Sequence, residues 1–140
     1  MRALTVWQPW AHCIAHLGKP LENRDWPPPV WLLGKRLAIH AGKTLDREAC
    51  ELIEELFDLR LPATYPHGAI VAVVTVPGAV TESESEWFSG KYGWLLKDKV
   101  ALPTPVPCRG AQGLWNLPAD VEDLVMGQLD LVTPTAAASR

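Results

Sequence analysis

A lysine, a glutamate and an arginine follow one another closely in the chain, at Lys19, Glu22 and Arg24. Glu22 and Arg24 are two positions apart, so on an extended strand their side chains project from the same face. Lysine and arginine bind phosphate, and the planar fork of arginine also matches the edge of a nucleobase. Glutamate serves as a general acid or base, or accepts a hydrogen bond from a base. The cluster therefore predicts either a binding or catalytic site, or an ion pair of Glu22 with Lys19 or Arg24.

Aromatic and amide side chains stand beside this cluster. The chain has seven tryptophans in 140 residues, and Trp10 lies two positions after Gln8. Aromatic faces next to basic groups suit the stacking of nucleobases, although tryptophan is also an ordinary core residue. Both Gln8 and Trp10 are candidate ligand contacts. Because Trp10 has helical spacing with Ile14, which favours the core, we expect Gln8 to make the main contact through its donor and its acceptor.

His40 and Lys43 form a second group of candidate ligand-binding residues. They lie at the end of a predicted strand over residues 36–41, and Thr44 is the predicted N-cap of the helix that follows. A helix N-terminus favours anions, so Lys43 is expected to extend the basic rim of the site. The upstream glycines of a phosphate-binding loop are absent, which excludes nucleotide hydrolysis of the P-loop type.

Hydrophobic periodicity and turn residues predict the elements that position these side chains. Gly18 ends the first helix, because glycine readily adopts the left-handed conformation found there. The second helix has a continuous apolar stripe that includes Leu52 and Leu56. The expected strands cover residues 3–7, 19–24, 36–41, 69–76, 92–96 and 100–102, and the expected helices run over 9–17, 44–57 and from Pro118 onward. This order lacks regular alternation and predicts an α+β fold with a small barrel.

Length and composition define the class of protein. The 140 residues are 48% hydrophobic and 21% charged, which predicts one domain over residues 1–132 and a frayed tail over 133–140. The longest apolar run, residues 69–74, is too short to span a membrane. The first residues also lack the apolar core of a signal peptide, so we expect a cytoplasmic protein without membrane partners.

Charge is unevenly distributed along the chain. The formal net charge of −3 argues against a strongly basic nucleic-acid binder. Residues 1–43 nevertheless carry six lysines or arginines and two acidic residues, whereas the remainder carries seven basic and fourteen acidic residues. This asymmetry predicts a local positive surface on the N-terminal third, or a set of scattered solvated lysines.

Cysteine and histidine spacing indicates neither a disulfide framework nor a metal site. The three cysteines are far apart and odd in number, and Cys13 and Cys50 have the pattern of buried small apolar residues. His12 and His16 are spaced four apart on the first helix, but no further ligands accompany them in the sequence. We therefore expect no metal and no cofactor.

The stretch that begins at Gly18 resembles the signature of the activating-signal-cointegrator homology (ASCH) domain, Gly-x-Lys-x-x-Glu-x-Arg. Lys19, Glu22 and Arg24 keep the spacing of its charged positions, with the glycine directly before the lysine. Residues 8–11 are similar to the Gln-Pro-Trp-Ala opening of one branch. Residues 37–43 and 92–94 extend the resemblance over most of the chain, which implies the PUA-like fold: a small mixed β-barrel with surrounding helices and a cleft at one end.

The resemblance implies binding of RNA or another nucleic acid. Some relatives are enzymes, namely an amidohydrolase that deacetylates acetylated cytidine and a ribonuclease that acts on single strands. The deacetylating branch uses a lysine, a nucleophilic threonine and a glutamate. Lys19 matches the lysine, but Glu22 stands in the place of the threonine, so that mechanism does not transfer directly to this chain.

Three hypotheses follow from these residues. The first is a module that binds single-stranded RNA or a modified base. In it, Lys19 and Arg24 hold phosphate or a base edge, Gln8 and Glu22 discriminate between ligands, and Lys43 extends the basic rim. The second is a metal-independent hydrolase acting on a modified nucleoside or RNA, with Lys19 and Glu22 as its catalytic acid–base pair. The third is a domain that binds a protein partner, which an exposed apolar patch away from the cleft would favour.

Overall fold

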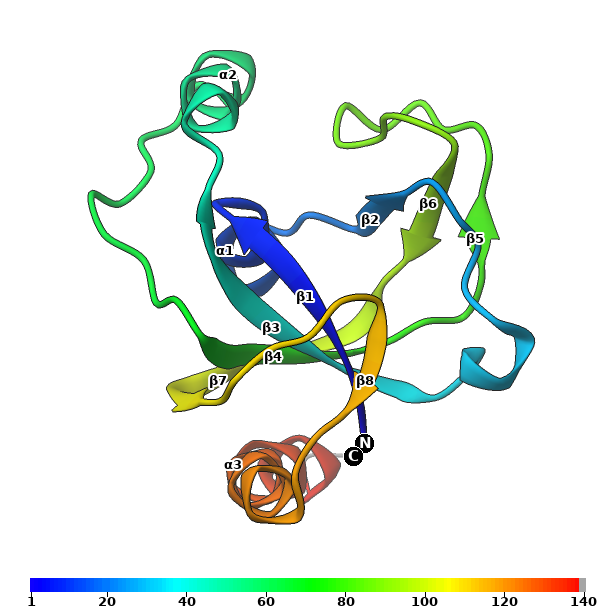
Figure 1. Cartoon of the computed structure of the whole chain (residues 1–140), viewed down its shortest axis with the longest axis vertical. Helices are drawn as coiled ribbons and strands as arrows, with labels where there is room; N and C mark the ends of the chain where they lie inside the picture. The colour runs from blue at the N-terminus through cyan, green and yellow to red at the C-terminus, as the bar shows by residue number, and fades with distance from the viewer. Residues whose placement is uncertain (139–140) are drawn as a thin grey trace.

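A computed structural model of the chain describes residues 1–138, with the side chains of residues 1–132. In this part of the chain, eight strands form two sheets, and three α-helices pack around them (Figure 1). The mixed α+β class expected from the sequence is confirmed. The strands are β1 (Arg2–Gln8), β2 (Leu21–Arg24), β3 (Arg36–Leu45), β4 (Ala69–Thr75), β5 (Ala79–Val80), β6 (Tyr92–Leu95), β7 (Lys97–Pro107) and β8 (Leu114–Asn116). The helices are α1 (Trp10–His16), α2 (Arg47–Phe57) and α3 (Ala119–Ala138), with a 3-10 turn η1 (Val30–Leu32).

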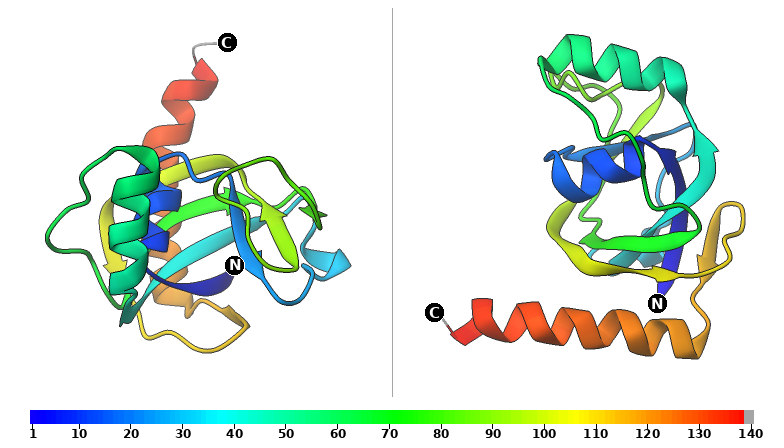
Figure 2. Two further views of the ribbon diagram at one scale, coloured as in Figure 1. Left: turned by 90° about the horizontal axis from the view of Figure 1, so that it is seen from above. Right: turned by 90° about the vertical axis from the view of Figure 1, so that its left-hand side faces the viewer.

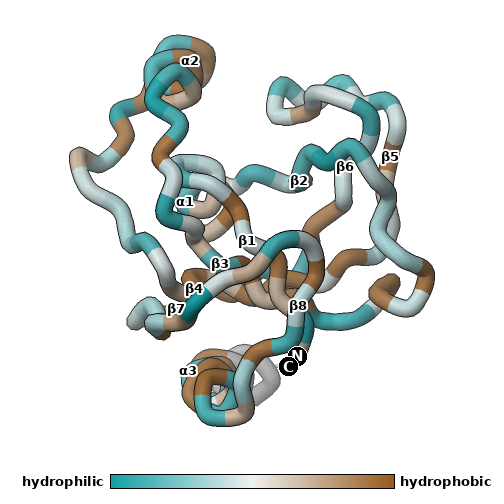
Figure 3. The backbone as a smooth tube through the Cα atoms, viewed as in Figure 1, coloured by the Kyte–Doolittle hydropathy of each residue, from teal (hydrophilic) through white to brown (hydrophobic). Residues whose placement is uncertain are grey.

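The larger sheet has the strand order β7-β4-β3-β1-β8. Strands β1 and β3 run parallel, and the other neighbours are antiparallel. β4 is buried along almost its whole length, which accounts for its unbroken run of apolar residues. Figure 3 shows the apolar backbone segments gathered where β1, β3 and β4 cross.

The smaller sheet has the order β2-β6-β5 and carries the charged motif. β2 pairs with β6 so that Glu22 lies opposite Trp94 and Arg24 lies opposite Tyr92. Trp94 is fully buried, its ring meets Trp26 edge-on at 4.7 Å, and its Nε1 donates a hydrogen bond to the Trp26 carbonyl at 2.9 Å. A large aromatic side chain, fixed by these contacts, therefore lies on the strand next to the motif.

Helix α1 leads directly into the motif strand. Its C-cap is Leu17, and the next residue, Gly18, has φ of +71°, as the sequence predicted for the end of this helix. The backbone N–H of Lys19 then donates to the Cys13 carbonyl at 3.1 Å. This hydrogen bond holds Lys19 immediately beside the helix, two residues before β2 begins.

The N-cap of helix α2 lies two residues later than predicted. β3 continues through residues 42–45, because Leu45 pairs with Gln8 of β1 and the Asp46 N–H donates to the Gln8 carbonyl at 2.7 Å. Asp46, and not Thr44, is the N-cap, since its carboxylate accepts from the Ala49 N–H at 3.1 Å. The expectation that the strand ends at residue 41 and that Thr44 caps the helix was therefore wrong: Lys43 lies on β3, three positions before the N-cap.

The apolar stripe of α2 is only partly covered. Ala49 and Ile53 are buried against Cys13 of α1, and Phe57 stacks on Trp87 at 4.0 Å. Leu52 and Leu56, which the periodicity placed in the same stripe, are 57% and 47% exposed. The covered face of α2 is thus narrower than its sequence pattern predicts.

Helix α3 lies beneath the larger sheet, and its C-terminal end projects beyond it (Figure 2). Val121, Val125 and Leu129 form its buried face against apolar side chains of the sheet. The helix continues to Ala138, into the segment 133–140 that we expected to be a frayed tail; its alanines at 136–138 favour helix strongly. Residues 139–140 lie outside the described chain. No helix of the described residues is both long and apolar enough to cross a membrane.

Strand β7 forms one edge of the larger sheet and is longer than the predicted segment 100–102. It contains three prolines, which belong on edge strands because they cannot donate to a ladder. The Gln128 amide of α3 accepts from the Thr104 N–H at 3.0 Å and donates to the Thr104 carbonyl at 2.7 Å. A side chain thus satisfies both backbone groups of Thr104, which lies where the register between β7 and β4 is interrupted.

Candidate functional site

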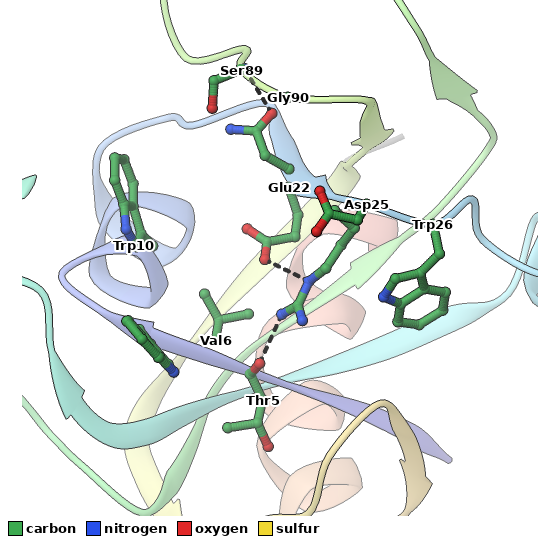
Figure 4. Close-up of a pocket in the computed structure, with 11 residues that line it drawn as sticks. Thr5, Val6, Trp10, Glu22, Asp25, Trp26, Ser89 and Gly90 are labelled. Carbon is green, nitrogen blue, oxygen red and sulfur yellow. Dashed lines mark hydrogen bonds and ion pairs between the residues drawn. The ribbon is translucent and has the colours of Figure 1, made fainter.

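A cavity of about 550 Å³ opens beside the charged motif (Figure 4). Its walls come from β1, from the start of α1, from β2 with the loop that follows it, and from the loop before β6. The lining residues are Thr5, Val6, Trp7, Trp10, Glu22, Asn23, Arg24, Asp25, Trp26, Ser89 and Gly90. We call this cavity the tryptophan pocket, because three of these residues are tryptophans.

Glu22 is the centre of an ion-pair network at the base of the tryptophan pocket. Its Oε1 lies 3.2 Å from Lys19 Nζ, and its Oε2 accepts from Arg24 Nε at 3.0 Å. Arg24 Nη2 also donates to the Thr5 carbonyl at 2.8 Å, which ties the smaller sheet to β1. The geometry matches the ion-pair alternative considered from the sequence, with Glu22 bonded to both basic residues.

Lys19 does not line the tryptophan pocket. Its side chain is only 2% exposed, and its Nζ lies 5.1 Å from the centroid of the Trp10 ring as well as beside Glu22. Burial of an ammonium group is tolerated here because a carboxylate and an aromatic face surround it. Lys19 therefore pairs with Glu22 without lining the cavity, whereas Glu22 and Arg24 both line it.

The aromatic walls of the tryptophan pocket differ in exposure. Trp7 is 55% exposed, whereas Trp10 and Trp26 are half-buried and packed against the core. Asn23 fixes the opposite rim, since its amide donates to the Trp87 carbonyl at 2.9 Å and accepts from the Ser89 N–H at 3.0 Å. The result is a preformed cavity with aromatic faces next to an anchored arginine.

Gln8 lies outside the tryptophan pocket. Its side chain is fully buried; its Nε2 donates to the Pro66 carbonyl at 2.9 Å, and its Oε1 accepts from the His12 N–H at 2.9 Å. Both ends of the amide are thus committed to the fold. The geometry favours a structural role for Gln8, as a link between α1 and the segment before β4.

His40 and Lys43 lie in a second cavity of about 570 Å³. Its other walls come from β1 and from the loop between β7 and β8. The lining residues are Thr5, His40, Gly42, Lys43, Gly68, Cys108, Arg109, Gly110, Ala111 and Gln112. We call this cavity the loop pocket. The sequence-predicted residues are therefore divided between two cavities, and Thr5 lines both of them.

A hydrogen-bond network fixes the floor of the loop pocket. His40 Nε2 donates to the Cys108 carbonyl at 2.7 Å, because a carbonyl can only accept, and His40 Nδ1 lies 3.2 Å from the Thr5 hydroxyl. That hydroxyl also accepts from Trp115 Nε1 at 3.2 Å. Burial lowers the pKa of His40, and the bond to Cys108 opposes this shift less strongly. His40 is therefore neutral at pH 7.

We expect His40 to make stability fall in mild acid. Its pKa is lower in the folded chain than in the unfolded chain, so the unfolded chain gains a proton first as the pH falls below about 6.5. Its contribution to stability is present above that pH and is lost as the pH falls through the folded pKa. Urea unfolding between pH 7 and 5 should show this slope, and His40→Gln should flatten it. An unchanged slope would contradict the prediction.

His12, whose pKa is lowered by burial and by His16, should add its own contribution to the same loss of stability in acid. His12→Gln should remove that contribution.

Sequence reasoning missed several of the lining residues. Thr5 and Trp7 were assigned only to a strand, and Arg109 lies in a loop without periodicity. The nearest signal in the sequence is the glycine-rich, aromatic stretch at 110–117. For a metal, the structure offers only the pair His12 and His16, whose rings are 5.0 Å apart; no group of three ligating side chains occurs among the described residues.

The fold is similar to that of solved ASCH structures. The ASCH protein of Zymomonas mobilis matches with a TM-score of 0.53 and 16% identity, over 90% of this chain and 93% of that one. Two point variants of that protein match with TM-scores of 0.53 and 0.54, at 15% and 16% identity, over 90% of this chain and 94% and 96% of theirs. No family model and no curated protein matches the sequence.

This similarity covers nearly all of both chains and confirms the ASCH resemblance at the level of the fold. The chain thus has the fold of these ASCH structures, with the charged motif on the smaller sheet.

Proposed function

We propose that the protein is an ASCH-type nucleic-acid-binding module that takes a base of single-stranded RNA, or a modified nucleobase, into the tryptophan pocket. The observation that carries this proposal is the preformed cavity in which Trp7, Trp10 and Trp26 adjoin the anchored Arg24. In this proposal, the two sheets form the wall of a small PUA-like barrel, with the cavity at one end. Aromatic faces recognise bases by stacking, which suits unpaired bases best.

Each group in the cavity has a role that its surroundings support. Trp7 is the most exposed of the three indoles and supplies a stacking face. Among the described residues, Arg24 uses Nε and Nη2 in hydrogen bonds, which leaves its Nη1 for a base edge. Asp25 is exposed at the rim, where its carboxylate can accept from an amino group of a base.

The distribution of charge at this cavity favours contacts with a nucleobase over contacts with the phosphate backbone of a nucleic acid. Lys19 and Arg24 are offset by Glu22 and Asp25, and the whole chain has a formal charge of −3. Proteins that bind duplexes mainly through phosphates need a broad excess of lysine and arginine. A single base held in a pocket needs much less positive charge, so a short unpaired segment is the ligand that fits best.

Trp7→Ala should weaken binding of single-stranded RNA by about 1–3 kcal/mol, the usual value of one base-stacking contact. Trp31→Ala is the matched control, because Trp31 is also exposed, at 45%, but lies against Arg2 outside the tryptophan pocket. Fluorescence anisotropy of labelled RNA measures both variants, and urea unfolding checks that each remains folded. Equal affinity of the Trp7 variant and the parent protein would overturn the assignment of this cavity.

The hydrolase alternative gains less support from the geometry. Lys19 is held by Glu22 and the Trp10 ring and does not reach the cavity surface, so it has no path to a substrate in the present arrangement. RNA recovered from the binding experiment and run on a denaturing gel tests for cleavage directly. Shortened RNA that depends on Glu22 would favour the hydrolase over the binding module.

A further inference from the structure

The loop pocket has the charge of an anion site, in contrast to the tryptophan pocket. Lys43 and Arg109 both line it, and no acidic residue does. Both side chains are exposed, and neither forms an ion pair with any side chain that the structure describes. Lys19 and Arg24, by comparison, are both paired with Glu22. In a chain with a net charge of −3, two unpaired cations at one cavity mark a preference for a negative ligand.

The floor of the loop pocket is polar and fixed. His40 is 2% exposed and held between the Thr5 hydroxyl and the Cys108 carbonyl. Gly110 lies directly against this pair: a Cβ at this position would be 2.5 Å from His40 Cε1 and 2.9 Å from Thr5 Oγ1. Only glycine allows the loop backbone to approach so closely, so the residue type at 110 keeps the loop in place beside Lys43 and Arg109.

The two cavities are immediate neighbours. Thr5 lines both, with its carbonyl bound to Arg24 on one side and its hydroxyl beside His40 on the other. Trp7 of the tryptophan pocket also lies against Gly42 of the loop pocket, since a Cβ on Gly42 would be 3.9 Å from Trp7 Cδ1. A ligand that fills both cavities must therefore carry an aromatic part and an anionic part close together.

We propose that the loop pocket binds the phosphate of the nucleotide whose base occupies the tryptophan pocket, with Lys43 and Arg109 as the phosphate-binding side chains. This inference rests on the proposed function, because it assigns the aromatic part of the ligand to a base. In a nucleotide, one sugar joins the base to its phosphate, which matches two cavities that share a single strand residue. His40 and the Thr5 hydroxyl keep the floor polar and place no negative charge beside the phosphate.

The double variant Lys43→Ala/Arg109→Ala tests the phosphate site. Lys35→Ala/Arg36→Ala is the matched control, because it removes the same two charges from exposed positions at the opposite end of β3. The double variant should bind single-stranded RNA at least tenfold more weakly, with a salt slope reduced by about 1–2, whereas the control should keep most of the affinity. Affinity for an uncharged nucleoside should be the same in both variants and in the parent protein.

The outcomes separate this inference from the proposed function. If the parent protein binds RNA and the Lys43/Arg109 variant binds it equally well, the phosphate site is wrong and the base-binding function stands. If the parent protein binds neither RNA nor a nucleoside, the proposed function fails. In that case, a titration with inorganic phosphate, followed by amide NMR shifts of residues 108–112, decides whether the loop pocket is an anion site; absence of shifts there overturns the inference as well.

Discussion

Glu22→Ala is expected to lower the free energy of unfolding by about 3–5 kcal/mol, because it leaves a buried ammonium group without its carboxylate. Lys19 has a side chain only 2% exposed and cannot reach water without local rearrangement. Arg24 would lose a partner too, but its side chain is 23% exposed and can be solvated. Most of the loss should therefore come from Lys19. Urea unfolding followed by tryptophan fluorescence measures it.

Two comparisons make this result specific. Asp25→Ala removes a carboxylate from the rim of the same cavity, but Asp25 is exposed, so the expected change is within about 0.5 kcal/mol. Lys19→Met combined with Glu22→Gln removes both buried charges and should recover much of the stability that Glu22→Ala loses. If the double variant is no more stable than Glu22→Ala, the unpaired lysine is not the cause of the loss.

Trp94→Ala is expected to cost a similar amount, about 3–5 kcal/mol, for a different reason. Trp94 is fully buried between the two sheets, so its removal leaves a large cavity in the core. It also removes the edge-on contact and the hydrogen bond that hold Trp26 at the wall of the tryptophan pocket. Ligand affinity should therefore fall together with stability.

Trp94→Phe separates packing from hydrogen bonding. Phenylalanine keeps an aromatic ring in the core but cannot donate to the Trp26 carbonyl, so the expected loss is about 1–3 kcal/mol. Binding of RNA should weaken in this variant because Trp26 is no longer fixed. A loss of stability equal to that of Trp94→Ala would mean that the hydrogen bond, and not the filled volume, dominates the contribution of Trp94.

Local sequence signals predicted the motif strand β2 and the end of the helix before it. Gly18 ends α1 with a positive φ, and the two-residue spacing brings Glu22 and Arg24 together on one face of β2, where they form an ion pair. These features depend on backbone preferences and strand alternation, which neighbouring residues alone determine. The α+β class also followed, because β4 is a continuous apolar run and α2 has a clear helical hydrophobic period.

The features that sequence reasoning missed depend on contacts between distant segments. Thr44 has the residue type of an N-cap, but pairing with β1 extends β3 past it, and Asp46 takes that place. Gln8 was expected to contact a ligand, but its amide donates a hydrogen bond to the distant Pro66 carbonyl. His40 and Arg24 line different cavities because β3 belongs to the larger sheet and β2 to the smaller one, an assignment that no local pattern specifies.

The outer edge of the larger sheet has a consequence for behaviour at high concentration. An exposed sheet edge is a template on which another chain can add a strand, and this is a common route to aggregation. In β7, three prolines remove donors from that template, and the Gln128 amide occupies both backbone groups of Thr104. At the opposite edge, β8 is only three residues long. Both edges of the larger sheet are thus poor templates for a further strand, so we expect the protein to resist strand-to-strand association at high concentration.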